Sequence, residues 1–387
     1  MDLLLTAAAV VVPDAVLRPG WVRVRGSRIA EVGHGLPHGP VRDPDGAVLD
    51  LGDAVVVAGF VDVHCHGGGG HSFGADPSES AAAAAAHLAH GTTTLVASLV
   101  TGPLDRTARE VDALAELVQQ GVLAGVHLEG PWLSAARCGA HDAALLRAPA
   151  PGDVDALVGR DAVRMVTLAP ELPGGLDAVR RVVGHGAVAA VGHTDADHAT
   201  TAAAVAAGAS HATHLFNAMR PVGHRDPGPV VALLAAEDVT LELIRDGVHL
   251  DPALTAWLDG CVAPGRLLSV TDAMAGAGLG DGRYELGGLT VVVADGVARV
   301  GGSGPIAGSV ATADVGFRAA AHGPGAGAPD DTGLLRASQQ ASASPARVLG
   351  LDHELGQVRA GLRADLAVLD PASLRVRRVL RAGTWLA

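Results

Sequence analysis

The stretch VDVHCHGGGG, residues 61–70, places two histidines one residue apart at the end of an apolar run and follows them with four glycines. Successive side chains of a strand point to opposite faces. This alternation predicts an apolar face and a polar face, with these members: Val61, Val63 and Cys65 on the first, and Asp62, His64 and His66 on the second. Glycine permits a sharp turn and a close approach, so the chain leaves room beside the histidines.

Seven further strand candidates follow this one along the chain. The eight are GFVDVHCH (59–66), TTTLVASLV (92–100), VLAGVHLEG (122–130), VRMVTLAPE (163–171), AVAAVGHTD (187–195), SHATHLFNA (210–218), TLELIRDGVHL (240–250) and RLLSVTDAM (266–274). Helical stretches separate several of them, at 78–90, 103–120, 195–207 and 252–260. Eight alternating units predict an α/β fold of the (β/α)8, TIM-like barrel type. A doubly wound open sheet is the alternative.

Both ends of the chain read differently from this centre. The N-terminal segment contains LLLTAAAVVV and WVRVRGSRIAEVG, and the C-terminal segment contains GQVRAGLRADLAVLD and RVRRVLRAGTWLA. These stretches have the character of short strands. Within the central part, residues 289–300 carry Asp-Gly between two apolar runs, which predicts an inserted hairpin.

Composition excludes several classes of protein. The net charge of −13 argues against a nucleic-acid surface, and no apolar run is long enough to span a bilayer. Three widely spaced cysteines fit a reduced, cytoplasmic protein better than a disulfide framework. The alternative of a signal peptide at the N-terminus is disfavoured, because no basic residue precedes Arg18 and Pro13 interrupts the apolar run.

Six residues with metal-binding chemistry stand at the ends of the strand candidates. They are His64, His66, Glu129, His193, His214 and Asp272. Since the carboxyl ends of barrel strands meet at one mouth, we expect these side chains to face one another. A single such histidine is more often an ordinary hydrogen-bonded residue, but six in this order favour a divalent ion such as Zn²⁺ or Fe²⁺.

Neighbouring residues limit the kind of metal site. His127 and His211 lie near the six but one strand position away, and we expect them to supply supporting hydrogen bonds. All 28 basic residues are arginine. A carboxylated lysine bridging two metals is therefore excluded, and any bridge must come from a carboxylate such as Glu129.

These motifs carry a family resemblance. AGFVDVHCH and the C-terminal SPARVLGLDHELGQVRAGLRADLAVLD are similar to the amidohydrolase superfamily. HLEGPWL, TLAPE, GHTDA, THLFNAM, DGVHL and VTDAM, in this order, resemble its N-acetylglucosamine-6-phosphate deacetylases. The resemblance covers nearly the whole chain. It implies a small β-sandwich domain formed by 1–56 and 353–387, and a barrel over 57–352 with an inserted hairpin near 283–302.

The resemblance also implies which residues hold metal and act in catalysis. Glu129, His193 and His214 resemble the primary metal ligands. His64 and His66 resemble the ligands of a second metal, with Glu129 between the two, so one or two divalent ions are expected per subunit, zinc first and iron next. Asp272 resembles a catalytic carboxylate at the metal site that takes a proton from an attacking metal-bound water and returns it to the leaving nitrogen. His141, in CGAHD, resembles the histidine that contacts the substrate carbonyl. Cys138 departs from the common pattern of that loop.

The remaining matched residues imply how substrate is bound. They are Asn217, Ala218, Arg225, His249 and Ile306. The substrate implied is an amino-sugar phosphate, whose phosphate needs a local cation in so acidic a chain, and Arg225 offers the matching fork of donors. The resemblance further implies a homodimer in which Arg225 and His249 reach the partner's site. Two alternatives stay open: a different amidohydrolase, acting on a cyclic amide, an N-acyl amino acid or an aminated base, and a non-catalytic scaffold of the same fold.

Overall fold

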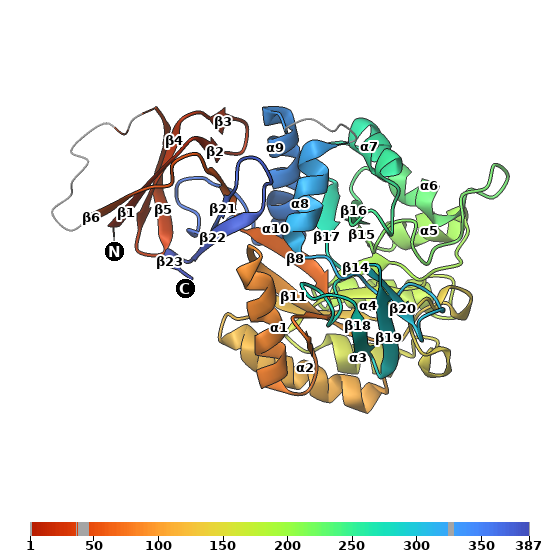
Figure 1. The fold of residues 1–387 in the computed structure, drawn as a ribbon. Coiled ribbons are helices and arrows are strands. Elements are labelled where there is room, and N and C mark those ends of the chain that lie inside the picture. The colour runs from red at the N-terminus through yellow and green to blue at the C-terminus, as the bar shows by residue number, and fades with distance from the viewer. Residues whose placement is uncertain (1, 36, 38–45, 324–328, 387) are drawn as a thin grey trace.

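A parallel eight-stranded sheet forms the centre of the protein in the computed structural model, which describes residues 2–35, 37, 46–323 and 329–386 (Figure 1). Its strands are β8 (Phe60–Cys65), β11 (Thr92–Val100), β12 (Gly125–Glu129), β13 (Val163–Leu168), β14 (Val188–Val191), β15 (His211–Ala212), β16 (Thr240–Ile244) and β17 (Leu267–Val270). Each strand pairs with the next in chain order. The sheet then returns on itself, because Ala273 bridges to Cys65 and the Asp272 N–H donates to the His64 carbonyl oxygen at 2.8 Å.

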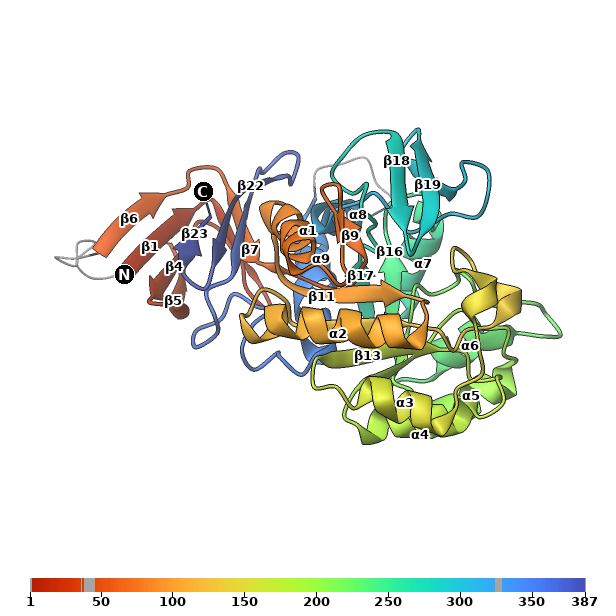
Figure 2. The same cartoon turned by 90° about the horizontal axis from the view of Figure 1, so that it is seen from below.

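This nearly closed ring confirms the predicted barrel and rules out the open sheet. Helices cover its outer surface, as Figure 2 shows for α2, α3 and α4. The helices are α1 (Pro77–Ala89), α2 (Leu104–Gln119), α3 (Pro151–Val158), α4 (Gly175–Gly184), α5 (His198–Ala206), α6 (Gly228–Ala235), α7 (Pro252–Cys261), α8 (Ala313–His322), α9 (Asp331–Ser338) and α10 (Ser344–Val348). The four predicted helical stretches correspond to α1, α2, α5 and α7.

Helix α1 illustrates how local sequence sets these elements. The Asp76 side chain accepts hydrogen bonds from the N–H groups of Ser78 and Glu79, and Pro77 occupies the first helical position. Both features are typical of helix starts. In α2, one face at helical spacing is buried, formed by Thr107, Val111, Leu114 and Leu117. That face packs into the main hydrophobic core around the barrel.

The first barrel strand departs from simple alternation. The prediction that Asp62 shares a face with His64 and His66 is wrong, because its carboxylate lies with the Cys65 thiol and the His87 imidazole, within 4.8 Å of both. The pairing of β8 with β11 contains two register shifts. Each shift adds a residue to one strand and rotates the side chains that follow it, so a period of two does not hold through this strand.

A second unit combines both ends of the chain. One sheet has the order β5-β4-β1-β6 and the other β23-β22-β21-β7-β2-β3. Their strands are β1 (Asp2–Ala7), β2 (Ala9–Val11), β3 (Val16–Leu17), β4 (Gly20–Arg25), β5 (Arg28–His34), β6 (Gly46–Asp50), β7 (Val55–Ala58), β21 (Leu366–Leu369), β22 (Val376–Arg381) and β23 (Thr384–Trp385). Leu5, Val22, Val56 and Val368 share one hydrophobic core between the sheets.

The predicted boundaries of this β-sandwich domain, 1–56 and 353–387, stay a prediction. Strand β7 runs to Ala58, across the predicted boundary, and residues 1, 36, 38–45 and 387 of the predicted domain lie outside the described residues. No helix in the described part of the chain combines the length and apolarity needed to cross a membrane.

A three-stranded antiparallel sheet follows the last barrel strand. It consists of β18 (Gly282–Leu286), β19 (Leu289–Ala294) and β20 (Val297–Val300). The pair β19 and β20 turns at Asp295 and Gly296, the Asp-Gly dipeptide that predicted a hairpin, and both residues have positive φ, +51° and +73°. The third strand, β18, was not predicted. The segment after β20 brings Ile306 to the pocket at the mouth of the barrel.

Candidate active site

The six strand-end residues meet at the carboxyl end of the barrel. His64 lies within β8 and Glu129 is the last residue of β12, whereas the other four follow their strands. His193, His214 and Asp272 have left-handed backbone conformations, with φ of +46°, +29° and +46°. Such conformations are uncommon outside glycine and cluster at functional sites.

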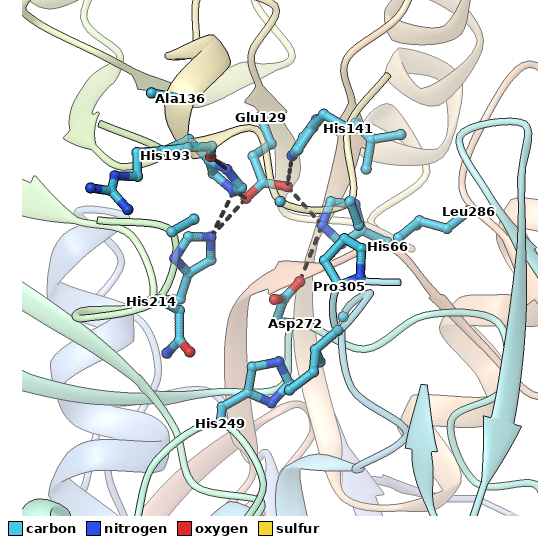
Figure 3. A pocket seen from close by; sticks show the side chains of 18 residues that line it. His66, Glu129, Ala136, His141, His193, His214, His249, Asp272, Leu286 and Pro305 are labelled. Carbon is cyan, nitrogen blue, oxygen red and sulfur yellow. Dashed lines mark hydrogen bonds and ion pairs between the residues drawn. The ribbon is translucent and has the colours of Figure 1, made fainter. Parts of the chain in front are cut away.

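Glu129 is at the centre of the cluster. Its Oε1 atom lies 3.1 Å from Nε2 of His193 and 3.1 Å from Nε2 of His214, and these two nitrogens are 3.0 Å apart. Its Oε2 atom lies 3.2 Å from His66 Nε2 and 3.3 Å from His141 Nε2 (Figure 3). One carboxylate therefore faces two groups of imidazoles through its two oxygens.

The second group forms around Asp272. Its Oδ1 atom lies 3.4 Å from His64 Nε2 and 3.3 Å from His66 Nε2, and those nitrogens are 3.1 Å apart. Both groups are buried, and within each group the potential ligand atoms lie within 4.8 Å of one another. The first group is Glu129, His193 and His214, and the second is His64, His66 and Asp272.

Both groups have the donor chemistry and spacing of a zinc or iron site. Zinc takes His nitrogens at about 2.0–2.1 Å in a tetrahedral arrangement, which places neighbouring ligand atoms about 3.3 Å apart. The measured separations within the two groups are close to this value. Imidazole with carboxylate also suits iron. The residues present therefore fit one divalent ion in each group, with Glu129 between them.

A pocket of about 350 Å³ opens above the cluster. Ten of the twelve residues predicted for the site line it, namely His66, Glu129, His141, His193, His214, Asn217, Ala218, His249, Asp272 and Ile306. His64 lies beneath it, fully buried. Arg225 does not line it, because its side chain is on the exposed loop between β15 and α6. The structure of one chain thus brings together every predicted site residue except Arg225. The expectation that His249 reaches a partner's site is wrong, because His249 lines the pocket of its own chain.

Comparison with known proteins agrees with this geometry. The sequence model of the amidohydrolase family matches residues 55–386. The chain belongs to the amidohydrolase family.

Curated and solved relatives refine that placement. A mutant of N-acetyl-D-glucosamine-6-phosphate deacetylase from Mycobacterium smegmatis, solved in complex with N-acetyl-D-glucosamine-6-phosphate, is 49% identical, covers 99% of both chains and superposes with a TM-score of 0.92. N-acetylglucosamine-6-phosphate deacetylase of Bos taurus is 37% identical over 86% of this chain and 84% of its own. N-acetylgalactosamine-6-phosphate deacetylase of Escherichia coli O157:H7 is 35% identical over 83% and 84%.

Electrostatics in this amidohydrolase keep the two central carboxyl groups ionised. Burial works to raise the pKa of Asp272, but the imidazoles of His64 and His66 outweigh it and lower that pKa to about 2. Burial acts on Glu129 in the same way, and again the surrounding imidazoles hold its pKa well below the ordinary value. Asp272 is therefore a carboxylate near neutral pH, able to accept a proton.

His141 presents a neutral N–H to the pocket. Burial lowers its pKa to about 4. The backbone N–H of Thr101 donates to His141 Nδ1 at 3.3 Å, and the Thr101 hydroxyl lies 2.9 Å from the same nitrogen. Because Nδ1 accepts, the ring proton resides on Nε2, which faces Glu129. Sequence reasoning missed Thr101, which directly follows β11 and belongs to no motif.

His249 has the opposite character. Burial works to lower its pKa, but Asp246, whose Oδ2 atom lies 2.7 Å from His249 Nδ1, raises it above the ordinary value. A raised pKa favours the imidazolium form, which suits an anionic group of a substrate. Asp246 was not predicted, although its place three residues before His249 in DGVHL is a usable signal.

Two further residues at the site escaped sequence analysis. Arg137 lines the pocket, pairs with Asp195 at 2.8 Å, and its carbonyl oxygen accepts from His193 Nδ1 at 2.9 Å. Glu242, inside the barrel, contacts His64 and His211. The expectation that His127 and His211 form supporting hydrogen bonds agrees with the structure, since His127 lies between Ser98 and Thr167.

Proposed function

We propose that this chain is a metal-dependent deacetylase that hydrolyses N-acetyl-D-glucosamine 6-phosphate to D-glucosamine 6-phosphate and acetate. The observation that carries the proposal is the pair of three-residue ligand groups joined by Glu129 at the floor of the pocket. The solved relative at 49% identity, in complex with this sugar phosphate, supports the choice of substrate. The reaction belongs to amino-sugar catabolism and cell-wall recycling. We place it in the cytoplasm, because Cys65, Cys138 and Cys261 are free thiols.

The metal is proposed to be zinc, with iron as the alternative, at one or two ions per subunit. His193, His214 and Glu129 would hold one ion, and His64, His66 and Asp272 the other. When bound, a divalent ion supplies Lewis-acid polarisation and lowers the pKa of water toward 7.

The chain's own residues then account for the proton transfers. The oxygen of water adds to the acetyl carbonyl carbon while Asp272 accepts its proton. His141 donates its Nε2–H to the carbonyl oxygen as negative charge develops there. Asp272 returns the proton to the sugar nitrogen as the carbon–nitrogen bond breaks, which yields acetate and the free amine.

The pocket wall is proposed to bind the sugar and its phosphate. Asn217, the Ala218 backbone, Ile306 and His249 line the pocket together with the ligand groups, and they would position the sugar phosphate. Arg225 is on an exposed loop beside Val222, which is 52% exposed. We propose that this loop joins a homodimer interface and that Arg225 serves the partner's phosphate site.

Acetate release is the test of the reaction. Purified protein is assayed on N-acetylglucosamine 6-phosphate, its unphosphorylated parent and N-acetylgalactosamine 6-phosphate, with metal content measured on the same sample. The galactosamine compound is included because of the relative named for it. The proposal expects the highest rate on the first and loss of activity on chelation, restored by a divalent ion. If the protein hydrolyses only a cyclic amide, an N-acyl amino acid or an aminated base, another amidohydrolase activity is favoured. If it hydrolyses none of these compounds and none of the sugars, a non-catalytic scaffold is favoured.

The cross-subunit part has its own test. Arg225→Ala protein and Asp272→Asn protein are mixed and allowed to exchange subunits. If Arg225 serves the partner's site, each mixed dimer contains one site with both defects and one intact site, so activity reappears. If exchange is confirmed and no activity returns, Arg225 does not act across the interface.

A further inference from the structure

The carboxylate of Glu242 is completely buried inside the barrel, at the third position of β16. Its Oε2 atom lies 3.0 Å from Nδ1 of His64 and accepts the backbone N–H of His214 at 3.0 Å. Its Oε1 atom lies 2.9 Å from Nε2 of His211. A single oxygen therefore contacts one member of each metal-ligand group.

The contact with His64 selects which ring nitrogen faces the pocket floor. When Nδ1–H donates to the carboxylate, the proton is on Nδ1 and Nε2 carries the free lone pair. That Nε2 atom is the one that lies 3.1 Å from His66 Nε2. A carboxylate behind a ligating histidine fixes its tautomer and orientation and increases its basicity.

The other three histidines of the two groups are held differently. His66 Nδ1 lies 3.1 Å from the Ser98 carbonyl oxygen, and His193 Nδ1 lies 2.9 Å from the Arg137 carbonyl oxygen. In the part of the chain that the structure describes, the buried Nδ1 atom of His214 has no hydrogen-bond partner. His64 is thus the ligand backed by a charged group.

We propose that Glu242 is a positioning residue for metal binding: it holds His64 as an Nε2 ligand and, through the shared Oε2 atom, couples the two ligand groups. This inference rests on the proposed metal sites. The competing interpretation is a purely structural hydrogen bond with His211, which predicts lower stability with unchanged metal affinity.

Zinc titration of the metal-free protein distinguishes the positioning role of Glu242 from the purely structural one. Wild type, Glu242→Gln and Asp314→Asn are titrated against a chromophoric chelator, and thermal unfolding of each metal-free protein is recorded. Asp314→Asn is the matched control, because it also replaces a buried, hydrogen-bonded carboxylate by an amide, but on α8. Loss of such an outer partner typically weakens metal affinity by about 10–100-fold. In Glu242→Gln we expect the affinity for one zinc ion to fall by this amount and the affinity for the second zinc ion to fall by less. Both zinc affinities of the control Asp314→Asn should be unchanged.

Two zinc affinities within about twofold of wild type in a folded Glu242→Gln protein would overturn the inference and leave the ligand groups intact. Wild type that binds fewer than two zinc ions would overturn it as well, whereas acetate release by the same sample would leave the proposed reaction standing. If the variant does not fold, ¹⁵N-histidine NMR of wild type decides, with the His64 signals assigned through His64→Gln. A proton on Nδ1 and zinc at Nε2 support the inference, and the reverse arrangement refutes it.

Discussion

Replacing His141 by alanine should reduce kcat without removing metal. The structure fixes the ring proton on Nε2, aimed at the pocket, because Thr101 donates to Nδ1. The ring stays neutral, since burial lowers its pKa to about 4. A positioned donor to a developing oxyanion contributes about 10²–10³ in rate, or roughly 2.7–4 kcal/mol. His141 belongs to neither ligand group, so the loss should appear in kcat at normal metal content.

The assay measures acetate release at saturating sugar phosphate, with metal content determined on each sample. His141→Gln is the control variant, because its amide N–H restores a donor on that side of the pocket and should recover part of the lost rate. The ratio of wild-type to alanine-variant kcat should stay constant between about pH 6 and pH 8, as the pKa of His141 lies well below this range. An unchanged kcat with a raised KM would refute the oxyanion role and assign His141 to ground-state binding.

Three further predictions address the other residues of the site. Asp272→Asn should reduce kcat by about 10²–10⁴-fold with substrate still bound in equilibrium titration; a change confined to KM would contradict a role in proton transfer. Replacing both His64 and His66 by glutamine should remove about one equivalent of metal by elemental analysis, and equal content before and after would refute a second site. The KM for the phosphorylated sugar should rise as pH increases through the raised pKa of His249, and Asp246→Asn should move that rise to lower pH; identical KM profiles would exclude phosphate binding by the imidazolium.

The barrel and the convergence of its strand-end residues could be predicted because both depend on local pattern. Apolar strands alternating with helices specify the barrel, and the barrel brings the carboxyl ends of its strands to one mouth. The sequence therefore indicated that Glu129, His193 and Asp272 meet, although they come from distant segments. This prediction did not depend on knowing which side chains are in contact.

Contacts between specific side chains could not be predicted from the sequence pattern. Glu242 stands out in TLELI as a charge within an apolar strand, yet its partner His64 is 178 positions away. Asp62 was assigned to the wrong face because the register shifts between β8 and β11 cannot be seen in a period of two. Arg225 was predicted at the site from a motif, yet its side chain is exposed on the loop between β15 and α6 and does not line the pocket.

Backbone conformation explains why some of the proposed ligands lie beyond their strands and Glu129 does not. Glu129 remains in the sheet, paired with Val100 and Thr167, and its length lets it reach both ligand groups. His214 and Asp272 must turn back toward the mouth, and their left-handed conformations cost about 1–3 kcal/mol each. Backbone hydrogen bonds hold the turn at Asp272, whose N–H donates to His64 O at 2.8 Å and whose carbonyl oxygen accepts from the Ser309 N–H at 2.7 Å. At His214 the corresponding N–H donates to a side chain, the Glu242 carboxylate, so the position of this proposed ligand depends on a residue that sequence pattern alone would assign to the core.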